Sequence, residues 1–76
     1  MRFPSEKELA RLREKYPPGT KVILDEMDDP QAPPVGTIGE VIAVDDAGQL
    51  VMNWESGGSL SLIPGVDKFR KVSEKP

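Results

Sequence analysis

The sequence contains no cysteine and no histidine among its 76 residues. Without cysteine the chain forms no disulfide and offers no thiolate ligand. Without histidine it lacks the usual imidazole metal ligand and general base. No apolar run approaches the roughly 20 residues that a membrane-spanning helix needs, and the N-terminus carries no signal-like hydrophobic segment. These absences predict a cytoplasmic protein that is not an enzyme, binds no metal or cofactor and does not associate with a membrane.

The residue types that remain do not occur in patterns typical of catalysis. Acidic residues gather at Asp25–Asp29 and at Asp45-Asp46, but without the spacing of a calcium-binding EF-hand. Solvated loop and turn carboxylates are therefore the preferred interpretation. The serines have no histidine to activate them, and Gly57-Gly58 is not followed by the Lys-Ser/Thr of a phosphate-binding loop.

Charge is segregated along the chain. Residues 1–24 carry six Lys or Arg and three Glu, and residues 68–76 carry four Lys or Arg and one Glu. Residues 25–67 between them carry nine Asp or Glu and no basic residue. In one interpretation the basic ends neutralise the acidic middle within the molecule, and in the other the acidic middle attracts a partner with a basic patch. An acidic middle argues against nucleic acid, which needs clustered Lys and Arg.

Half of the apolar residues fall between Val35 and Ile63, in the pattern of two consecutive β-hairpins. β-Branched residues dominate one segment, and in the next two a period of two makes one face apolar and the other mixed or polar. Leu60 and Leu62 are expected to face Met52 and Trp54 across a ladder. Gly39 within a strand predicts a bulge or bend at a barrel corner. The predicted strands are Thr20–Met27, Thr37–Asp45, Leu50–Glu55, Ser59–Leu62 and Lys68–Val72.

A short helix is predicted over residues 5–16. Ser5 and Glu8 have the spacing of a capping box, in which each side chain bonds the backbone amide of the other residue. Leu9, Leu12 and Tyr16 share one helical face, and the prolines that follow end the helix. A helix this short is marginal alone, so its apolar face should dock on the strands.

The order of these elements predicts a mainly β fold, a five-stranded SH3-like small barrel preceded by one short N-terminal α-helix. We expect a single monomeric domain over residues 1–76, with the helix at 5–16, the barrel at 20–72 and a frayed tail at 73–76. A five-stranded OB-type barrel is the alternative. That fold usually places a helix between its third and fourth strands, where this chain has only four residues.

Several short motifs resemble those of a known family. They are Tyr16–Thr20 (YPPGT), Met27–Pro30 (MDDP), Pro34–Thr37 (PVGT), Asn53–Glu55 (NWE) and Ile63–Asp67 (IPGVD). Residues 16–72 thereby resemble a small domain-of-unknown-function family of bacterial, phage and mobile-element genomes. The resemblance implies an SH3-like barrel but no assigned biochemistry. The glycine-spaced hairpins are also similar to KOW-like and other SH3-like modules, which often bind nucleic acid, ribosomal proteins or peptides.

The leading functional hypothesis is a non-catalytic interaction module that binds a protein partner. Three prolines keep the stretch from Asp28 to Gly36 out of a ladder, and loops on a rigid scaffold often carry binding sites. The prolines could equally serve only to stiffen this loop. Trp54 belongs either to the core or to the barrel rim beside the loop. The predicted partner-binding residues are Tyr16, Asp28, Asp29, Pro30, Pro33, Pro34, Asp45, Asp46 and Trp54.

The alternative hypothesis is a nucleic-acid-binding accessory module. It requires that the two basic ends of the chain converge in space, because a contiguous basic face is the footprint of nucleic-acid binding. A third hypothesis is a purely structural domain that works within an assembly. The predicted nucleic-acid-binding residues are Arg11, Arg13, Lys15, Lys68, Arg70 and Lys71.

Overall fold

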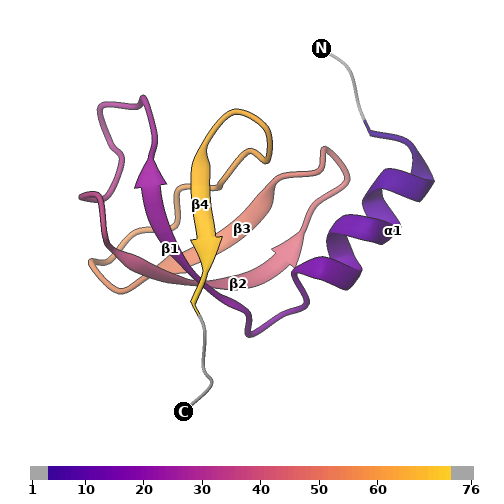
Figure 1. The fold of residues 1–76 in the computed structure, drawn as a ribbon, viewed down its shortest axis with the longest axis horizontal. Helices are drawn as coiled ribbons and strands as arrows, with labels where there is room; N and C mark the ends of the chain where they lie inside the picture. The colour runs from indigo at the N-terminus through magenta and orange to yellow at the C-terminus, as the bar shows by residue number, and fades with distance from the viewer. Residues whose placement is uncertain (1–3, 73–76) are drawn as a thin grey trace.

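A computed structural model describes residues 4–72, so the tail predicted at 73–76 lies outside the described residues. One helix precedes a four-stranded antiparallel sheet with the strand order β3-β2-β1-β4 (Figure 1). The mainly β prediction is confirmed at this level. The elements are α1 (Glu6–Lys15), β1 (Lys21–Glu26), β2 (Ile38–Val44), β3 (Leu50–Trp54) and β4 (Lys68–Lys71).

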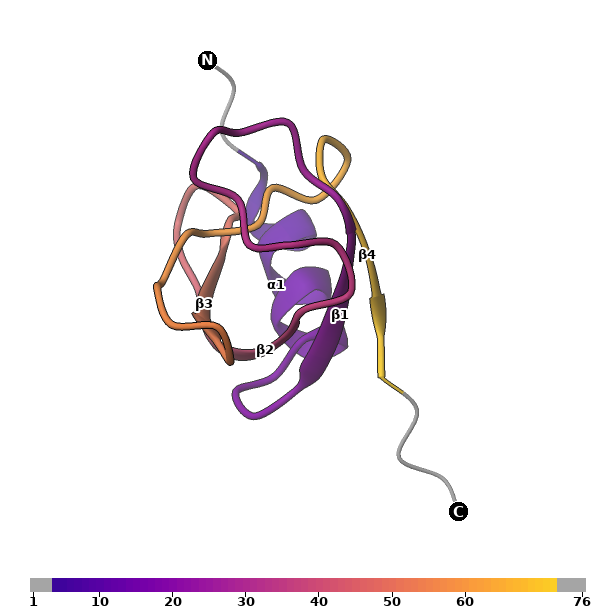
Figure 2. The same ribbon diagram turned by 90° about the vertical axis from the view of Figure 1, so that its left-hand side faces the viewer.

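The sheet curves, so that β3 and β4 lie on opposite sides of the molecule with α1 behind them at one end (Figure 2). Register shifts interrupt β2 between Val41 and Ala43 and β1 between Leu24 and Glu26. Such bulges bend a strand and increase its twist.

The prediction that Gly39 marks a bulge is wrong, because the register is regular there. Gly39 lies opposite Trp54 in the ladder between β2 and β3. A Cβ at this position would lie 2.5 Å from Cε3 of Trp54 and 2.8 Å from Cε of Met52. The glycine is needed because the indole ring packs directly on its backbone.

The first predicted hairpin is confirmed and the second is wrong as a ladder. Residues 59–61 form no strand, and only Leu62 forms a bridge, with Leu50. The Trp54 amide donates to the carbonyl oxygen of Gly58 in the same register as the Leu50–Leu62 bridge, so both ends of this hairpin are paired. Between them the indole Nε1 of Trp54 donates to the carbonyl oxygen of Leu60 at 2.8 Å. The Trp54 side chain therefore occupies the Leu60 carbonyl oxygen, which in a regular hairpin would accept a hydrogen bond from a backbone amide of the opposite strand.

Helix α1 begins with the predicted capping box. The Ser5 hydroxyl accepts from the amide of Glu8, and the Glu8 carboxylate accepts from the amide of Ser5. The predicted docking of the apolar face is also confirmed, because Leu9 and Leu12 pack against the core and Tyr16 is part of it. At ten residues and with its charged surface, α1 is unsuited to crossing a membrane.

The core lies between the curved sheet and the helix. Trp54 is only 2% exposed, so the core interpretation of this residue is confirmed. The alternation predicted for β3 is also confirmed, since Leu50, Met52 and Trp54 are buried and Asn53 is exposed. The buried apolar residues are Tyr16, Val22, Leu24, Val41, Val44, Leu50, Met52, Trp54 and Leu62.

Candidate functional site

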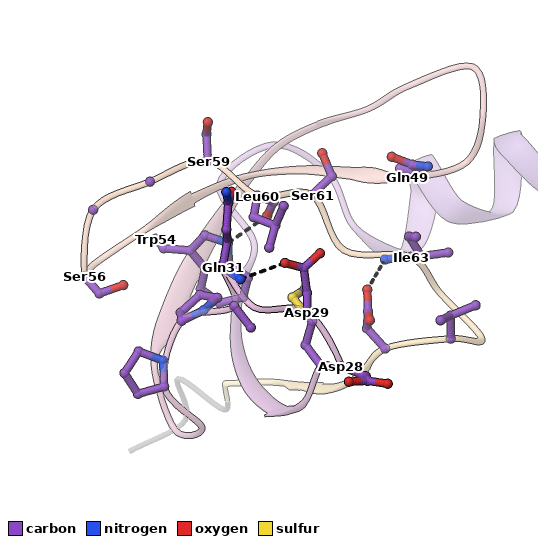
Figure 3. Close-up of a pocket in the computed structure, with 18 residues that line it drawn as sticks. Asp28, Asp29, Gln31, Gln49, Trp54, Ser56, Ser59, Leu60, Ser61 and Ile63 are labelled. Carbon is purple, nitrogen blue, oxygen red and sulfur yellow. Dashed lines mark hydrogen bonds between the residues drawn. The ribbon is translucent and has the colours of Figure 1, made fainter.

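A groove of about 860 Å³ separates the loop after β1 from the segment after β3 (Figure 3). We call it the loop groove. One side comes from Met27–Pro34 and the other from Ser56–Ile63, with Val66 and Asp67 at one end. These two stretches lie far apart in the sequence and meet only in the fold. The lining residues are Met27, Asp28, Asp29, Gln31, Ala32, Pro33, Pro34, Gln49, Trp54, Ser56, Gly57, Gly58, Ser59, Leu60, Ser61, Ile63, Val66 and Asp67.

Local hydrogen bonds shape the loop side of the groove. The Asp29 carboxylate accepts from the amide of Gln31 at 2.8 Å, and the Asp29 carbonyl oxygen accepts from the amide of Ala32 at 3.0 Å. The amide of Gly36 donates to the carbonyl oxygen of Leu24, which returns the loop to the sheet. An Asp that bonds an amide two residues ahead is a standard turn former. The loop is thus ordered by its own sequence.

Trp54 holds the opposite side in place. Its ring is buried on Gly39, and its indole N–H bonds the Leu60 carbonyl oxygen from below the groove (Figure 3). The amides of Ser59, Leu60 and Ser61 donate no hydrogen bond to any residue between 4 and 72. This wall therefore offers backbone donors that the fold itself does not use.

The charge of the loop groove is uniformly negative. Asp28, Asp29 and Asp67 line it, and none of the Lys or Arg residues that the structure describes does. The Asp28 side chain makes no hydrogen bond or ion pair with a described residue, whereas Asp67 accepts from the amide of Ile63 at 2.8 Å. Val66 adds an apolar side chain that is 71% exposed. The groove thus combines carboxylates, apolar groups and backbone donors.

The structure brings five of the predicted partner-binding residues together at this groove: Asp28, Asp29, Pro33, Pro34 and Trp54. Pro30 belongs to the same loop but does not line the groove. Tyr16, Asp45 and Asp46 lie elsewhere. Tyr16 is in the core against Phe69, and the two aspartates form the turn between β2 and β3.

Sequence reasoning missed the wall from Ser56 to Ser61 and the exposed Val66. The wall was assigned to a turn and a strand, so its backbone was expected to be paired. Gly57 and Gly58 both adopt positive φ values, 90° and 103°. Because two such residues in succession are typical of a tight hairpin turn, the glycine pair gave no signal of an unpaired wall.

The six predicted nucleic-acid-binding residues fall into two groups. Three of them pair with carboxylates: Arg13 with Asp46 at 3.2 Å, Lys68 with Glu26 at 3.5 Å and Arg70 with Asp25 at 2.9 Å. The hydrogen bond and charge of Asp25 raise the pKa of Arg70 above its ordinary value. Basic ends therefore neutralise part of the acidic middle within the molecule, as one interpretation of the charge pattern predicted.

The other three residues, Arg11, Lys15 and Lys71, form no ion pair with a carboxylate in residues 4–72. Arg11 is exposed on α1 beside Pro4 and Gly48. Lys15 and Lys71 both lie over the ring of Tyr16, each with its Nζ 5.4 Å from the ring centroid. The basic ends thus converge, but through two lysines rather than six cationic residues.

No group of three or more Asp or Glu side chains within residues 4–72 is placed to share a metal ion.

Comparisons with known proteins place the chain in a family without assigned biochemistry. A search of curated proteins and a search of solved structures each returned no match. A family model described as "Domain of unknown function (DUF4314)" matches residues 5–72, which include α1 and all four strands. Because this match spans most of the 76 residues, the chain belongs to the DUF4314 family.

Proposed function

We propose that this protein is a non-catalytic interaction module whose loop groove binds a basic segment of a protein partner. The observation that carries the proposal is that Asp28 and Asp29 line one groove together with residues 59–61, whose amides donate no hydrogen bond within residues 4–72. Carboxylates on one wall attract Lys and Arg side chains, and the amides on the other can bond a peptide backbone. Exposed apolar groups such as Val66 supply buried area on binding.

We also infer that the curved sheet belongs to an SH3-like barrel. The bridge between Leu50 and Leu62 adds a further segment beside β3, so the order continues as Leu62-β3-β2-β1-β4. The number of segments equals the five strands expected from the sequence. In this arrangement the loop groove lies between the two longest connections, where a rigid scaffold supports binding loops.

The test is a selection of binders from a random peptide library displayed on phage, with the full chain as bait. Peptides rich in Lys or Arg should be enriched, and an amide chemical-shift titration of labelled protein should place them at residues 28–34 and 56–61. The affinity should fall as salt is raised, because exposed charges are screened.

A charge-matched pair of variants tests the role of the loop. Asp28→Asn/Asp29→Asn removes two charges from the groove but leaves an oxygen at position 29 for the Gln31 amide. Glu6→Gln/Glu14→Gln removes two charges from exposed positions on α1. Only the first variant should weaken binding of the selected peptides, by about tenfold or more. Enrichment of no peptide, or shifts confined to residues outside the groove, would overturn the proposal.

A further inference from the structure

Two lysines from opposite ends of the chain lie over one tyrosine ring. Lys15 ends α1 and Lys71 ends β4, and each ammonium nitrogen is 5.4 Å from the centroid of Tyr16. The ring itself is held in the core, 9% exposed and 5.7 Å from the ring of Phe69. The ends of α1 and β4 lie at the same side of the molecule (Figure 1). A buried aromatic ring thus holds two like charges at defined positions on the surface.

No described carboxylate neutralises either lysine. Three other cations of these two elements are paired, Arg13 of α1 with Asp46 and Lys68 and Arg70 of β4 with Glu26 and Asp25. Lys15 and Lys71 make no such pair within residues 4–72. In a chain with a net charge of −3, two ammonium groups at one tyrosine ring, without an ion pair within residues 4–72, form a local site for an anion.

The surface beside Lys71 extends this positive region. A shallow hollow next to it is lined by Pro18, Gly19, Thr20, Lys21, Lys71 and Val72, with no acidic residue among the described ones, whereas the hollow beside Lys15 and Tyr16 is also lined by Asp25 and Asp67. The Val72 amide bonds the Lys21 carbonyl oxygen at 2.9 Å, which places Lys21 on the strand beside Lys71. Lys21 faces Glu40 in the register of β1 and β2, so Lys15 and Lys71 remain the principal charges.

We propose that Lys15 and Lys71, with Tyr16 between them, form a contact site for the phosphate backbone of a nucleic acid. Both charges are lysines, whose compact ammonium group binds phosphate as a point charge without the planar geometry that arginine and carboxylate share. The hollow beside Lys71 has no described lining residue in common with the loop groove, and the hollow beside Lys15 shares Asp67 with it.

The test is fluorescence anisotropy of dye-labelled single-stranded DNA and RNA with the full chain, measured over a series of salt concentrations. Lys15→Gln/Lys71→Gln should weaken binding on the order of tenfold at low salt. It should also reduce the slope of log affinity against log salt by about 1.4–1.8, because each phosphate contact contributes about 0.7–0.9. Lys15→Arg/Lys71→Arg keeps the charges and should retain most of the affinity and slope.

The control variant is Lys7→Gln/Arg11→Gln, which removes the same charge from exposed positions of α1. An equal loss in this control would overturn the proposal, since net charge alone would then explain binding. Binding of polyglutamate with the same dependence on Lys15 and Lys71 would also overturn it, in favour of an acidic protein surface. Absence of nucleic-acid binding at low salt would end it as well, while peptide binding in the loop groove would be unaffected.

Discussion

Two pairs of aspartates look alike in the sequence, and the fold uses them differently. Asp45 accepts hydrogen bonds from the amides of Ala47 and Gln49 and so closes the turn between β2 and β3, while Asp46 pairs with Arg13 of the helix. Asp28 and Asp29 line the loop groove, and Asp28 has no partner among residues 4–72. The comparison shows that an acidic pair in a turn serves stability when amides and cations lie within reach. Asp29 likewise bonds the Gln31 amide, whereas Asp28 has no such group within reach among residues 4–72, so its charge remains available for binding.

The largest expected effect on stability comes from replacing Trp54, which is part of the core and also lines the loop groove. Trp54→Ala should destabilise the protein by about 3–5 kcal/mol, because it leaves a cavity beside Gly39 and Met52. A domain of this size is marginally stable, so urea denaturation should find little folded protein. Trp54→Phe removes the indole N–H but keeps an aromatic ring, and it should remain folded.

In Trp54→Phe, the amide resonances of residues 58–61 should shift more than those of the β2–β3 turn, since the bond to the Leu60 carbonyl oxygen is lost. Unchanged resonances of residues 58–61 would mean that Trp54 does not position this wall. The contrast between the loop groove and the β2–β3 turn would then be wrong.

Gly39→Ala should have the next largest effect, about 1–3 kcal/mol, because the added methyl group overlaps the ring of Trp54. Thermal unfolding and the fluorescence of the single tryptophan are the measurements. Gly19→Ala is the control, since an added Cβ there meets nothing within 4 Å and only its φ of +94° is strained. The control should cost about 1–2 kcal/mol without changing the fluorescence of the folded state. A fluorescence change of equal size in both variants would contradict the packing argument.

The smallest effects concern the two acidic pairs themselves. Asp45→Ala should destabilise the protein by about 1–2 kcal/mol, because two partly buried amides lose their acceptor. Asp28→Ala should change the free energy of unfolding by no more than about 0.5 kcal/mol, as at an exposed position without partners. Denaturation in urea of both variants measures the difference directly. Equal losses would show that Asp28 also serves the fold, and its assignment to the loop groove would then be wrong.

Much of the fold could be predicted because it rests on local patterns. The capping box, the apolar face of α1, the alternation along β3 and the turn at Asp45–Gln49 each depend on residues a few positions apart. The second hairpin could not be predicted in this way. Its failure as a ladder depends on the Trp54 indole, which reaches a carbonyl oxygen six residues away only once its ring has packed on Gly39.

The candidate site was predicted in part. The loop from Asp28 to Gly36 was recognised from its prolines and carboxylates, whereas the opposing wall was not, because its unpaired amides follow from the missing ladder. The six basic residues were treated as one set, although the fold pairs three of them with carboxylates up to 45 positions away.

By itself the sequence determined the helix cap, the strand periodicity and the segregation of charge, because each is set by residue type and short-range spacing. Only the tertiary structure decided which charges are neutralised and which remain available for binding. It placed Arg13, Lys68 and Arg70 against carboxylates, and it left Asp28 at a groove and Lys15 and Lys71 over Tyr16. The physical reason is that ion pairing requires atoms within a few ångströms, and that proximity is set by the packing of the core.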